Sequence, residues 1–155
     1  MTLRLARIKD IDLIYNWVNK EDSISNKLLT NNVISQLEHK EWFENSIKNK
    51  NRFIWIIEEE NRNIGQLRFD IKDMHNRCFI DIYIDKEYRN KNYAKKAINE
   101  AIDYIKSNNN INCFVAKVLK SNFNSLKFFK KLGFKEYKKF NTYYELILMK
   151  NKSYE

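Results

Sequence analysis

A chain of 155 residues, 43% of them hydrophobic and 14% aromatic, is long enough to bury a sizeable core, which excludes an intrinsically disordered segment. Its formal net charge of +9 is compatible with nucleic acid, an anionic membrane or a phosphorylated ligand. The chain is also rich in Lys, Asn and Ile, a bias that AT-rich coding produces without any function. We therefore expect no nucleic-acid partner.

The first half of the chain alternates between strand-like and helical patterns. A short strand is expected at 3–7, followed by a helix that Asp10 is placed to cap. Residues 20–33 are polar and unperiodic, which predicts a loop, and a second helix follows at about 35–49. Two strands with an Asn-rich turn between them then form a hairpin, at 53–57 and 64–69.

The second half begins with an alternating strand at 79–84 and a short basic loop. The next helix has apolar residues at i, i+3, i+4 and i+7 spacing, namely Ala94, Ala97, Ile98, Ala101, Ile102 and Ile105. A strand at 113–118 precedes a helix at 122–132, which Gly133 ends as a left-handed C-terminal residue. A final hairpin comprises strands at 134–138 and 143–149.

This order of elements predicts the fold class. Antiparallel hairpins flank one parallel crossover, which indicates an α+β fold with a mixed, mostly antiparallel twisted sheet and about four helices. No linker, repeat or low-complexity block divides the chain, so we expect one domain over residues 1–155.

The two cysteines and the N-terminus bear on the compartment. Cys78 and Cys113 lie in strand-like runs without a CxxC spacing or a neighbouring His, so we expect buried thiols and neither a disulfide nor a metal site. Residues 1–5 contain no apolar signal core, and no apolar run approaches membrane-spanning length. The prediction is a cytoplasmic protein without a membrane partner.

The most informative stretch is the strand at 79–84 with the basic loop and helix that follow it. Unpaired backbone N–H groups and the positive end of the helix dipole converge at such a helix start. The geometry suits a pyrophosphate and therefore predicts a phosphorylated cofactor. The alternative is a solvated basic turn before an ordinary helix.

With these elements the chain resembles the GCN5-related N-acetyltransferase (GNAT) family over nearly its whole length. One part of the resemblance is a turn similar to the family's Arg/Gln-x-x-Gly-x-Gly/Ala motif, here Arg89-Asn90-Lys91-Asn92-Tyr93-Ala94. The other is similar to the family's closing signature, here Asn122-x-x-Ser125-x-x-x-Phe129-x-x-x-Gly133-Phe134. Both motifs occur in order, separated by a helix and a strand.

Two residues depart from the family pattern. Asn92 replaces the usual glycine, and Asn tolerates the left-handed conformation better than other non-glycine residues. Phe129 stands where many members carry a tyrosine that protonates the leaving thiolate. A phenyl ring donates no proton, so either another group does this or the thiolate leaves without help.

The resemblance implies acetyl-CoA as cofactor, with its pyrophosphate on the backbone of residues 89–94. The strand at 79–84 would separate from the next strand at a bulge and lie along the pantetheine arm, and one of its N–H groups would polarise the thioester carbonyl. Asn122 either reaches the pantetheine or caps its helix, or does both. The implied cofactor-binding residues are Ile82, Tyr83, Ile84, Arg89, Asn90, Lys91, Asn92, Tyr93, Ala94, Asn122, Ser125 and Phe129.

The implied reaction is direct attack of a primary amine on acetyl-CoA. The amine is protonated at neutral pH, so a base is needed. Asp81 and Asp70 are the carboxylate candidates, each with the alternative of a structural ion pair. His39 is a third candidate, as base or as substrate contact, with an ordinary helix histidine as the alternative.

A narrower resemblance concerns the acceptor. Three segments look like the acetyltransferases of bacterial nonulosonic acid pathways, which act on nucleotide-linked amino sugars: Asn16-Trp17-Val18-Asn19, His39-x-x-Trp42-Phe43 and Ile64-Gly65-Gln66-Leu67-Arg68-Phe69-Asp70. Val18 stands where that group carries Arg. Arg68 would pair with a substrate phosphate, and Trp17 and Trp42 would stack on the sugar or base, or else are core.

Two other functions remain open, an acetyltransferase that acts on a protein N-terminus or lysine, and a non-catalytic acyl-CoA-binding module. A homodimer is also possible, through an exposed strand edge at 143–148.

Overall fold

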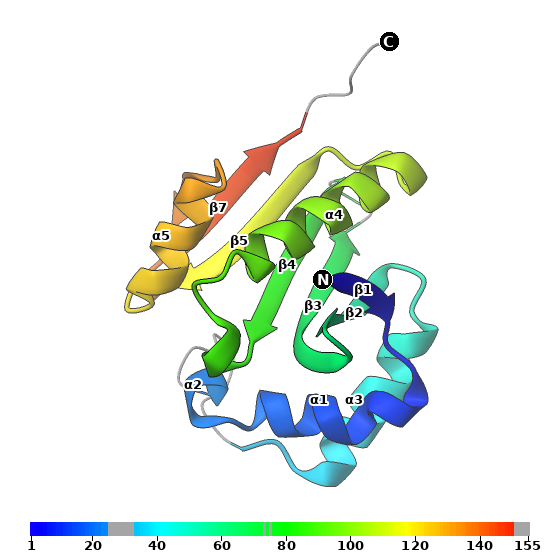
Figure 1. The fold of residues 1–155 in the computed structure, drawn as a ribbon. Coiled ribbons are helices and arrows are strands. Elements are labelled where there is room, and N and C mark those ends of the chain that lie inside the picture. The colour runs from blue at the N-terminus through cyan, green and yellow to red at the C-terminus, as the bar shows by residue number, and fades with distance from the viewer. Residues whose placement is uncertain (25–32, 73, 75, 151–155) are drawn as a thin grey trace.

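The computed structural model describes residues 1–24, 33–72, 74 and 76–150, and Figure 1 shows its fold. Seven strands, five α-helices and two short 3₁₀ turns are assigned in these residues. In chain order they are β1 (Thr2–Leu5), η1 (Ile8–Asp10), α1 (Ile11–Val18), α2 (Glu21–Ile24), α3 (Gln36–Lys48), β2 (Arg52–Glu59), β3 (Arg62–Lys72), β4 (Arg77–Ile84), η3 (Lys86–Tyr88), α4 (Tyr93–Asn108), β5 (Cys113–Leu119), α5 (Phe123–Lys131), β6 (Lys135–Lys139) and β7 (Tyr143–Met149).

All seven strands belong to one sheet, in the order β1-β2-β3-β4-β5-β7-β6. Neighbouring strands are antiparallel except β4 and β5, which are parallel and connected through α4. The predicted α+β class with a mixed, mostly antiparallel sheet is confirmed. The expected number of about four helices agrees with the five assigned; the additional one, the short α2, lies in the segment 20–33 for which a loop is predicted. Residues 25–32 of that predicted loop lie outside the described part of the chain.

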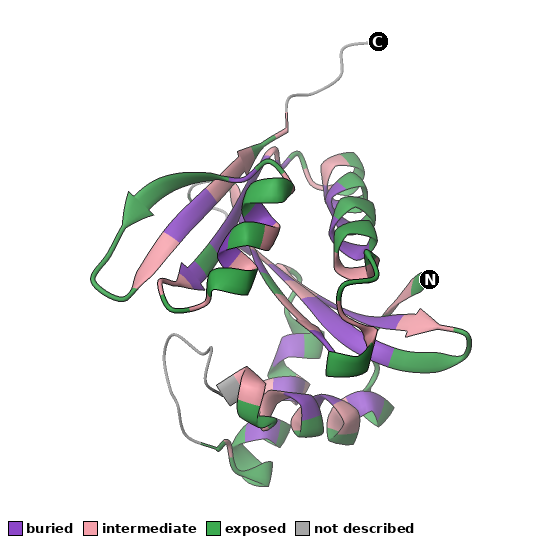
Figure 2. Cartoon of the chain, turned by 60° about the vertical axis from the view of Figure 1, so that its left-hand side comes forward, coloured by how far each residue is buried: buried purple, intermediate pink, exposed green. Residues whose placement is uncertain are grey.

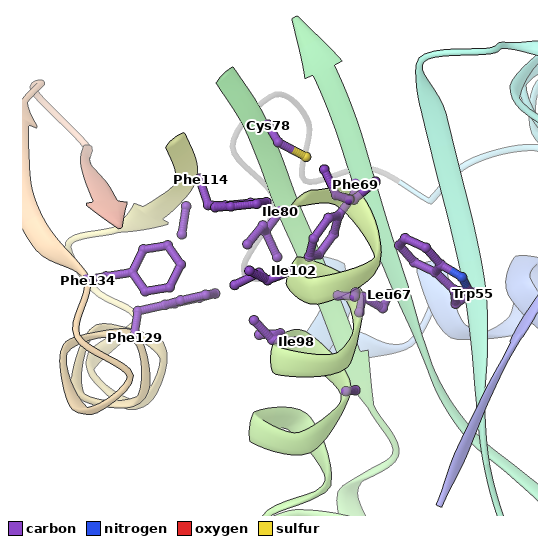
Figure 3. Packing of buried hydrophobic residues seen from close by; sticks show 14 of the residues in the cluster. Trp55, Leu67, Phe69, Cys78, Ile80, Ile98, Ile102, Phe114, Phe129 and Phe134 are labelled. Atoms are coloured by element: carbon purple, nitrogen blue, oxygen red, sulfur yellow. The ribbon is translucent and has the colours of Figure 1, made fainter. Parts of the chain in front are cut away.

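Each face of the sheet has its own hydrophobic cluster. The larger one joins the sheet to α4 and α5, and its centre contains Phe69, Ile98 and Phe114, all fully buried (Figure 3). The smaller one joins β2 to α1 and α3 through residues such as Ile14, Phe43 and Ile56 on the opposite face. Residues of β2 therefore alternate between two buried sides, and Figure 2 marks the buried residues in purple.

Local chemistry explains most helix ends, with one correction. The Ser35 hydroxyl caps α3 by accepting the Glu38 N–H at 3.2 Å. Gly133 has φ of +99° just after α5, as predicted. Asp10 precedes α1, but its side chain does not cap that helix. Its carboxylate instead accepts two hydrogen bonds from Arg4, at 2.8 and 2.9 Å, and ties β1 to the start of α1.

The prediction that residues 143–148 form an exposed strand edge for a dimer is wrong, because these residues lie inside the sheet. These residues belong to β7, which pairs with β5 on one side and with β6 on the other. The exposed edge of this hairpin is β6, whose five residues are all exposed. The error arose because a hairpin in the sequence does not reveal which of its two strands joins the sheet.

The prediction of buried thiols is confirmed, since Cys78 and Cys113 are free and buried. Within the described residues, the structure contains no helix with both the length and the apolar character needed to cross a membrane.

Candidate active site

The central feature of the site is an opening between β4 and β5. The two strands pair only from Arg77↔Cys113 to Ile80↔Ala116. Beyond this point β4 continues to Ile84, while β5 continues to Leu119 with β7 as its partner. The predicted separation of these strands is therefore present. The predicted bulge is not, because β4 stays in continuous register with β3 over eight pairs.

The backbone of β4 beside this opening has a definite orientation. The Asp85 N–H donates to the Ile64 carbonyl of β3 at 2.8 Å. Successive residues of a strand turn their backbone groups to opposite sides, so Tyr83 also faces β3 whereas Ile82 and Ile84 face the opening. The Ile84 carbonyl accepts a 2.8 Å hydrogen bond from Arg89 Nε. The N–H groups of Ile82 and Ile84 are thus placed to pair with an extended ligand as an added strand would.

The basic loop ends in the helix start that the sequence predicts. Asn90 and Asn92 have φ of 61° and 67°, so both adopt the left-handed conformation. Asn92 is the N-terminal flanking residue of the sixteen-residue α4, and its carbonyl accepts the Lys96 N–H at 3.1 Å. The N–H groups of the first helical turn have no partner within the helix and point out of its N-terminus. Asn92 therefore provides the turn conformation for which the family uses glycine, and the turn presents amides that suit a pyrophosphate.

The side chain of Arg89 joins this loop to the N-terminal helices. Its guanidinium contacts the Asp22 carboxylate of α2, at 2.5 Å between Nη2 and Oδ2. The Tyr83 hydroxyl donates to the other Asp22 oxygen at 3.4 Å. Burial raises the pKa of Asp22, but the hydrogen bond and charge of Arg89 outweigh it, and the net shift is downward. Arg89 thus holds α2 against the end of β4, and its predicted contact with a pyrophosphate stays a prediction.

A second charged cluster lies on the α3 side of β3 and β4. The Arg68 guanidinium lies 3.3 Å from Asp70 and 3.8 Å from Asp81. Asp70 is also bound by Arg52 at 2.6 Å, and both arginines lie over the Trp42 ring, at 5.5 and 5.4 Å from its centroid. The side chain of Asp81 is 64% exposed and adjoins the last paired residue of β4. We call the point where β4 and β5 part, after Ile80 and Ala116, the mouth of the opening. The structure therefore brings four of the predicted residues together beside this mouth, namely Trp42, Arg68, Asp70 and Asp81.

Trp17 and His39 are both buried in the packing of the N-terminal helices. Trp17 is 2% exposed and packs in the smaller cluster. His39 is 3% exposed, its Nε2 lies 3.0 Å from the Ile11 carbonyl, and its ring stacks on Phe43. This geometry favours the alternative interpretation for both, namely core residues, because a fully packed ring has no free surface for a substrate.

The closing signature has mainly structural contacts in the described residues. The Asn122 side chain caps α5 by accepting the Ser125 N–H at 3.2 Å, so the capping role is present. Phe129 is 4% exposed and packs edge-on against Phe128. It packs in the same way against Phe134 (Figure 3). Contacts of these residues with the pantetheine arm stay predictions.

Sequence reasoning missed several charged residues near the opening. Lys117 and Glu145 are in register on β5 and β7, and each is the one charged residue in its strand. A single charged residue within an otherwise apolar strand is visible in the sequence and could have marked both residues as candidates. Asp22 gave no such signal, because it lies 67 residues before Arg89 in an unperiodic segment.

The fold and the site together define a class of protein. A sheet that opens between two parallel strands, next to a helix start whose N–H groups have no partner within the helix, can hold a long thioester carrier with a pyrophosphate in its middle. Residues 1–135 match the family model of the acetyltransferase (GNAT) domain. The chain belongs to this family and is an acetyl-CoA-dependent N-acetyltransferase.

The comparisons with individual proteins agree with the family. One relative is YwnH from Bacillus subtilis (strain 168), which is provisionally assigned as a phosphinothricin acetyltransferase. It is 29% identical over 144 residues, which cover 88% of this chain and 85% of the relative. The spermidine N-acetyltransferase from Vibrio cholerae, solved in complex with CoA and spermine, has a TM-score of 0.83 at 21% identity, over 96% of this chain and 94% of that one. A domain from Methanocaldococcus jannaschii DSM 2661 has a TM-score of 0.84 at 21% identity, over 96% and 97% of the two chains.

Proposed function

We propose that the chain transfers the acetyl group of acetyl-CoA to the primary amine of a nucleotide-linked amino sugar. The observation that carries this proposal is the pair of Arg68 and Asp81 at the mouth of the opening. A carboxylate attracts the ammonium form of the acceptor, and a guanidinium fork matches a phosphate. The Arg68 Nε lies 3.3 Å from the Asp70 carboxylate, whereas its Nη2 lies 3.8 Å from Asp81, a long contact that a ligand phosphate can replace.

The aromatic neighbour of Arg68 supports the same acceptor. Trp42 is half-buried, and its ring lies beside Arg68. An indole ring with an accessible part is suited to stack on a sugar or a base. The named relatives act on small amines or are assigned to do so, which supports a small-molecule acceptor over a protein.

In this proposal a backbone N–H group of the chain stabilises the reacting carbonyl, and a carboxylate takes the proton of the amine. Acetyl-CoA would supply the acetyl thioester: the acceptor nitrogen bonds to the carbonyl carbon, the C–S bond breaks, and coenzyme A leaves as its thiolate. The Ile82 N–H faces the opening and donates to the thioester oxygen as charge develops there. Asp81 accepts the proton of the amine and passes it to water, since its side chain is 64% exposed. Asp70 is a weaker candidate for the base because two arginines already contact it.

The test measures CoA release with a panel of acceptors at fixed acetyl-CoA, namely UDP-glucosamine, glucosamine, spermidine and a lysine peptide. We expect the highest kcat/KM with UDP-glucosamine. Arg68→Lys should lower it about tenfold, equivalent to about 1.4 kcal/mol, because the bidentate fork is lost. Arg52→Lys is the matched control, since Arg52 shares the contacts with Asp70 and Trp42 but does not contact Asp81.

Two results would contradict the proposal. Preference for spermidine or for the peptide over UDP-glucosamine would contradict the proposed acceptor class. An equal loss in the Arg68 and Arg52 variants would show that Arg68 supports the fold and does not bind the acceptor.

A further inference from the structure

Lys117 occupies a special position in β5. The last paired residues of β4 and β5 are Ile80 and Ala116, so Lys117 is the first residue of β5 beyond the pairing and stands across from Asp81. It is exposed, and its ammonium lies 5.0 Å from the centroid of the Phe79 ring of β4. Opposite charges thus stand on the two sides of the mouth, at the point where the strands part.

The neighbours of Lys117 leave its charge uncompensated. Glu145 is its register partner on β7, but that carboxylate is 6% exposed and forms its ion pair with Arg77. Asp81 has Arg68 as its ion-pair partner. Within the residues that the structure describes, Lys117 forms no ion pair, and its contact is the cation–π interaction with Phe79. That contact holds the ammonium on the same face of the sheet as Asp81.

We propose that Lys117 binds an acidic group of the acceptor and thereby sets the substrate class. A carboxylate on one side of the mouth and a free ammonium on the other match a molecule that carries an amine and an oxyanion close together. The substrate class is therefore an amine with a phosphate or carboxylate group, and a polyamine is disfavoured by repulsion from Lys117. This inference rests on the proposed function in one respect, namely that the acceptor amine lies at Asp81.

The test uses binding, so that it needs no turnover. The probes are glucosamine 6-phosphate, glucosaminic acid and glucosamine itself, which has no acidic group. Each is titrated calorimetrically into protein saturated with CoA, so that the proposed pyrophosphate site at the start of α4 is already filled. We expect at least one acidic probe to bind about tenfold more tightly than glucosamine, which corresponds to about 1.4 kcal/mol. Comparison of glucosamine 6-phosphate with glucosaminic acid shows whether the preferred acidic group is a phosphate or a carboxylate.

Substitutions assign the preference to Lys117. Lys117→Met keeps the apolar stem over Phe79 and should abolish the tenfold preference, while Lys117→Arg should retain most of it. Lys120→Met is the matched control, because Lys120 also lies over an aromatic ring, that of Tyr144 at 5.5 Å, but just past the end of β5. We expect this control to bind all three probes as the unsubstituted protein does.

The outcomes separate this inference from the proposed function. Equal binding of acidic probes and glucosamine would overturn the inference, as would a preference that survives in Lys117→Met. A uniform fall in kcat for every acceptor in that variant would also overturn it, since that pattern assigns Lys117 to the leaving thiolate. If the preference depends on Lys117 but no amino-sugar nucleotide is acetylated, the proposed acceptor fails and the inference stands.

Discussion

Gly65 provides a sharp test of how the opening is built. It lies opposite Ile84 in the register of β3 and β4. A Cβ added at this position would lie 2.3 Å from the Tyr83 carbonyl oxygen and 3.0 Å from Ile84 Cδ1. The nearer atom belongs to the backbone, so no rotamer change relieves the contact. Since carbon contacts are normally about 3.5 Å, β4 must move by roughly 1 Å.

The movement has two expected consequences for Gly65→Ala. Overpacking of this kind costs about 1–3 kcal/mol in the free energy of unfolding, which a urea titration measures. The displaced segment carries the N–H groups of Ile82 and Ile84 that face the opening. These N–H groups are placed to pair with the cofactor, and a shift of about 1 Å lengthens such hydrogen bonds beyond their normal range, so we expect the KM for acetyl-CoA to rise at least about tenfold.

Gly133→Ala is the matched control, since the chain contains only two glycines. Gly133 has φ of +99°, and a Cβ there would approach only Leu148 Cδ1, at 3.5 Å. The strain of a left-handed alanine costs about 1–2 kcal/mol, so stability falls to a similar extent. The KM for acetyl-CoA should stay unchanged, because Gly133 lies between α5 and β6. Equal KM values in the two variants would refute the argument that Gly65 sets the position of β4.

Three further predictions concern the cofactor loop, an ion pair and a thiol. Arg89→Ala combined with Lys91→Ala should raise the KM for acetyl-CoA about tenfold or more, equivalent to about 1.4 kcal/mol; an unchanged KM in steady-state assays would remove the pyrophosphate assignment. The hydrogen bonds and charge of Arg4 lower the pKa of Asp10 in the folded protein. The contribution of Asp10 to the free energy of unfolding is therefore complete above the ordinary carboxyl pKa of about 3.9, and it is lost as the pH falls through the lowered pKa of the folded state. Asp10→Asn should therefore cost about 3 kcal/mol at neutral pH and flatten the acid limb of a stability–pH profile, and an unchanged limb would contradict this. Burial raises the pKa of the Cys78 thiol, so it should react with a disulfide reagent only at the rate of unfolding; rapid labelling of the native protein would show that this part of the core opens.

The features that the sequence predicts correctly depend on local chemistry. Asn92 and Gly133 are each identified by their own residue type at a helix end, and both have the expected left-handed backbone. The parallel crossover follows from a strand, a helix stripe and a second strand in succession. Such features need no knowledge of distant residues, so their prediction succeeds.

The features that the sequence does not predict depend on distant partners. An apolar stripe places Trp17 on one face of a helix but does not tell whether that face is core or site, and the structure buries it. Arg89 belongs to a basic turn, yet its guanidinium bonds to Asp22, which no local pattern connects to it. Likewise, the exchange of β6 and β7 in the sheet order is decided by packing against β5.

The replacement of the family tyrosine by Phe129 determines where the chemical difficulty of the reaction lies. The Phe129 ring is 4% exposed and carries no proton to give to the leaving thiolate. A thiol has a pKa of about 8.5 and an alkyl ammonium one of about 10.4, so the thiolate is the weaker base and leaves with less need of an acid. In the proposed reaction, the remaining demand is removal of the amine proton, for which a carboxylate open to water is suited. Asp81 meets that condition at the mouth of the opening, whereas Asp70 is held by two arginines. We therefore infer that a chain with Phe129 relies on its base, and on the N–H groups of β4, for its rate acceleration.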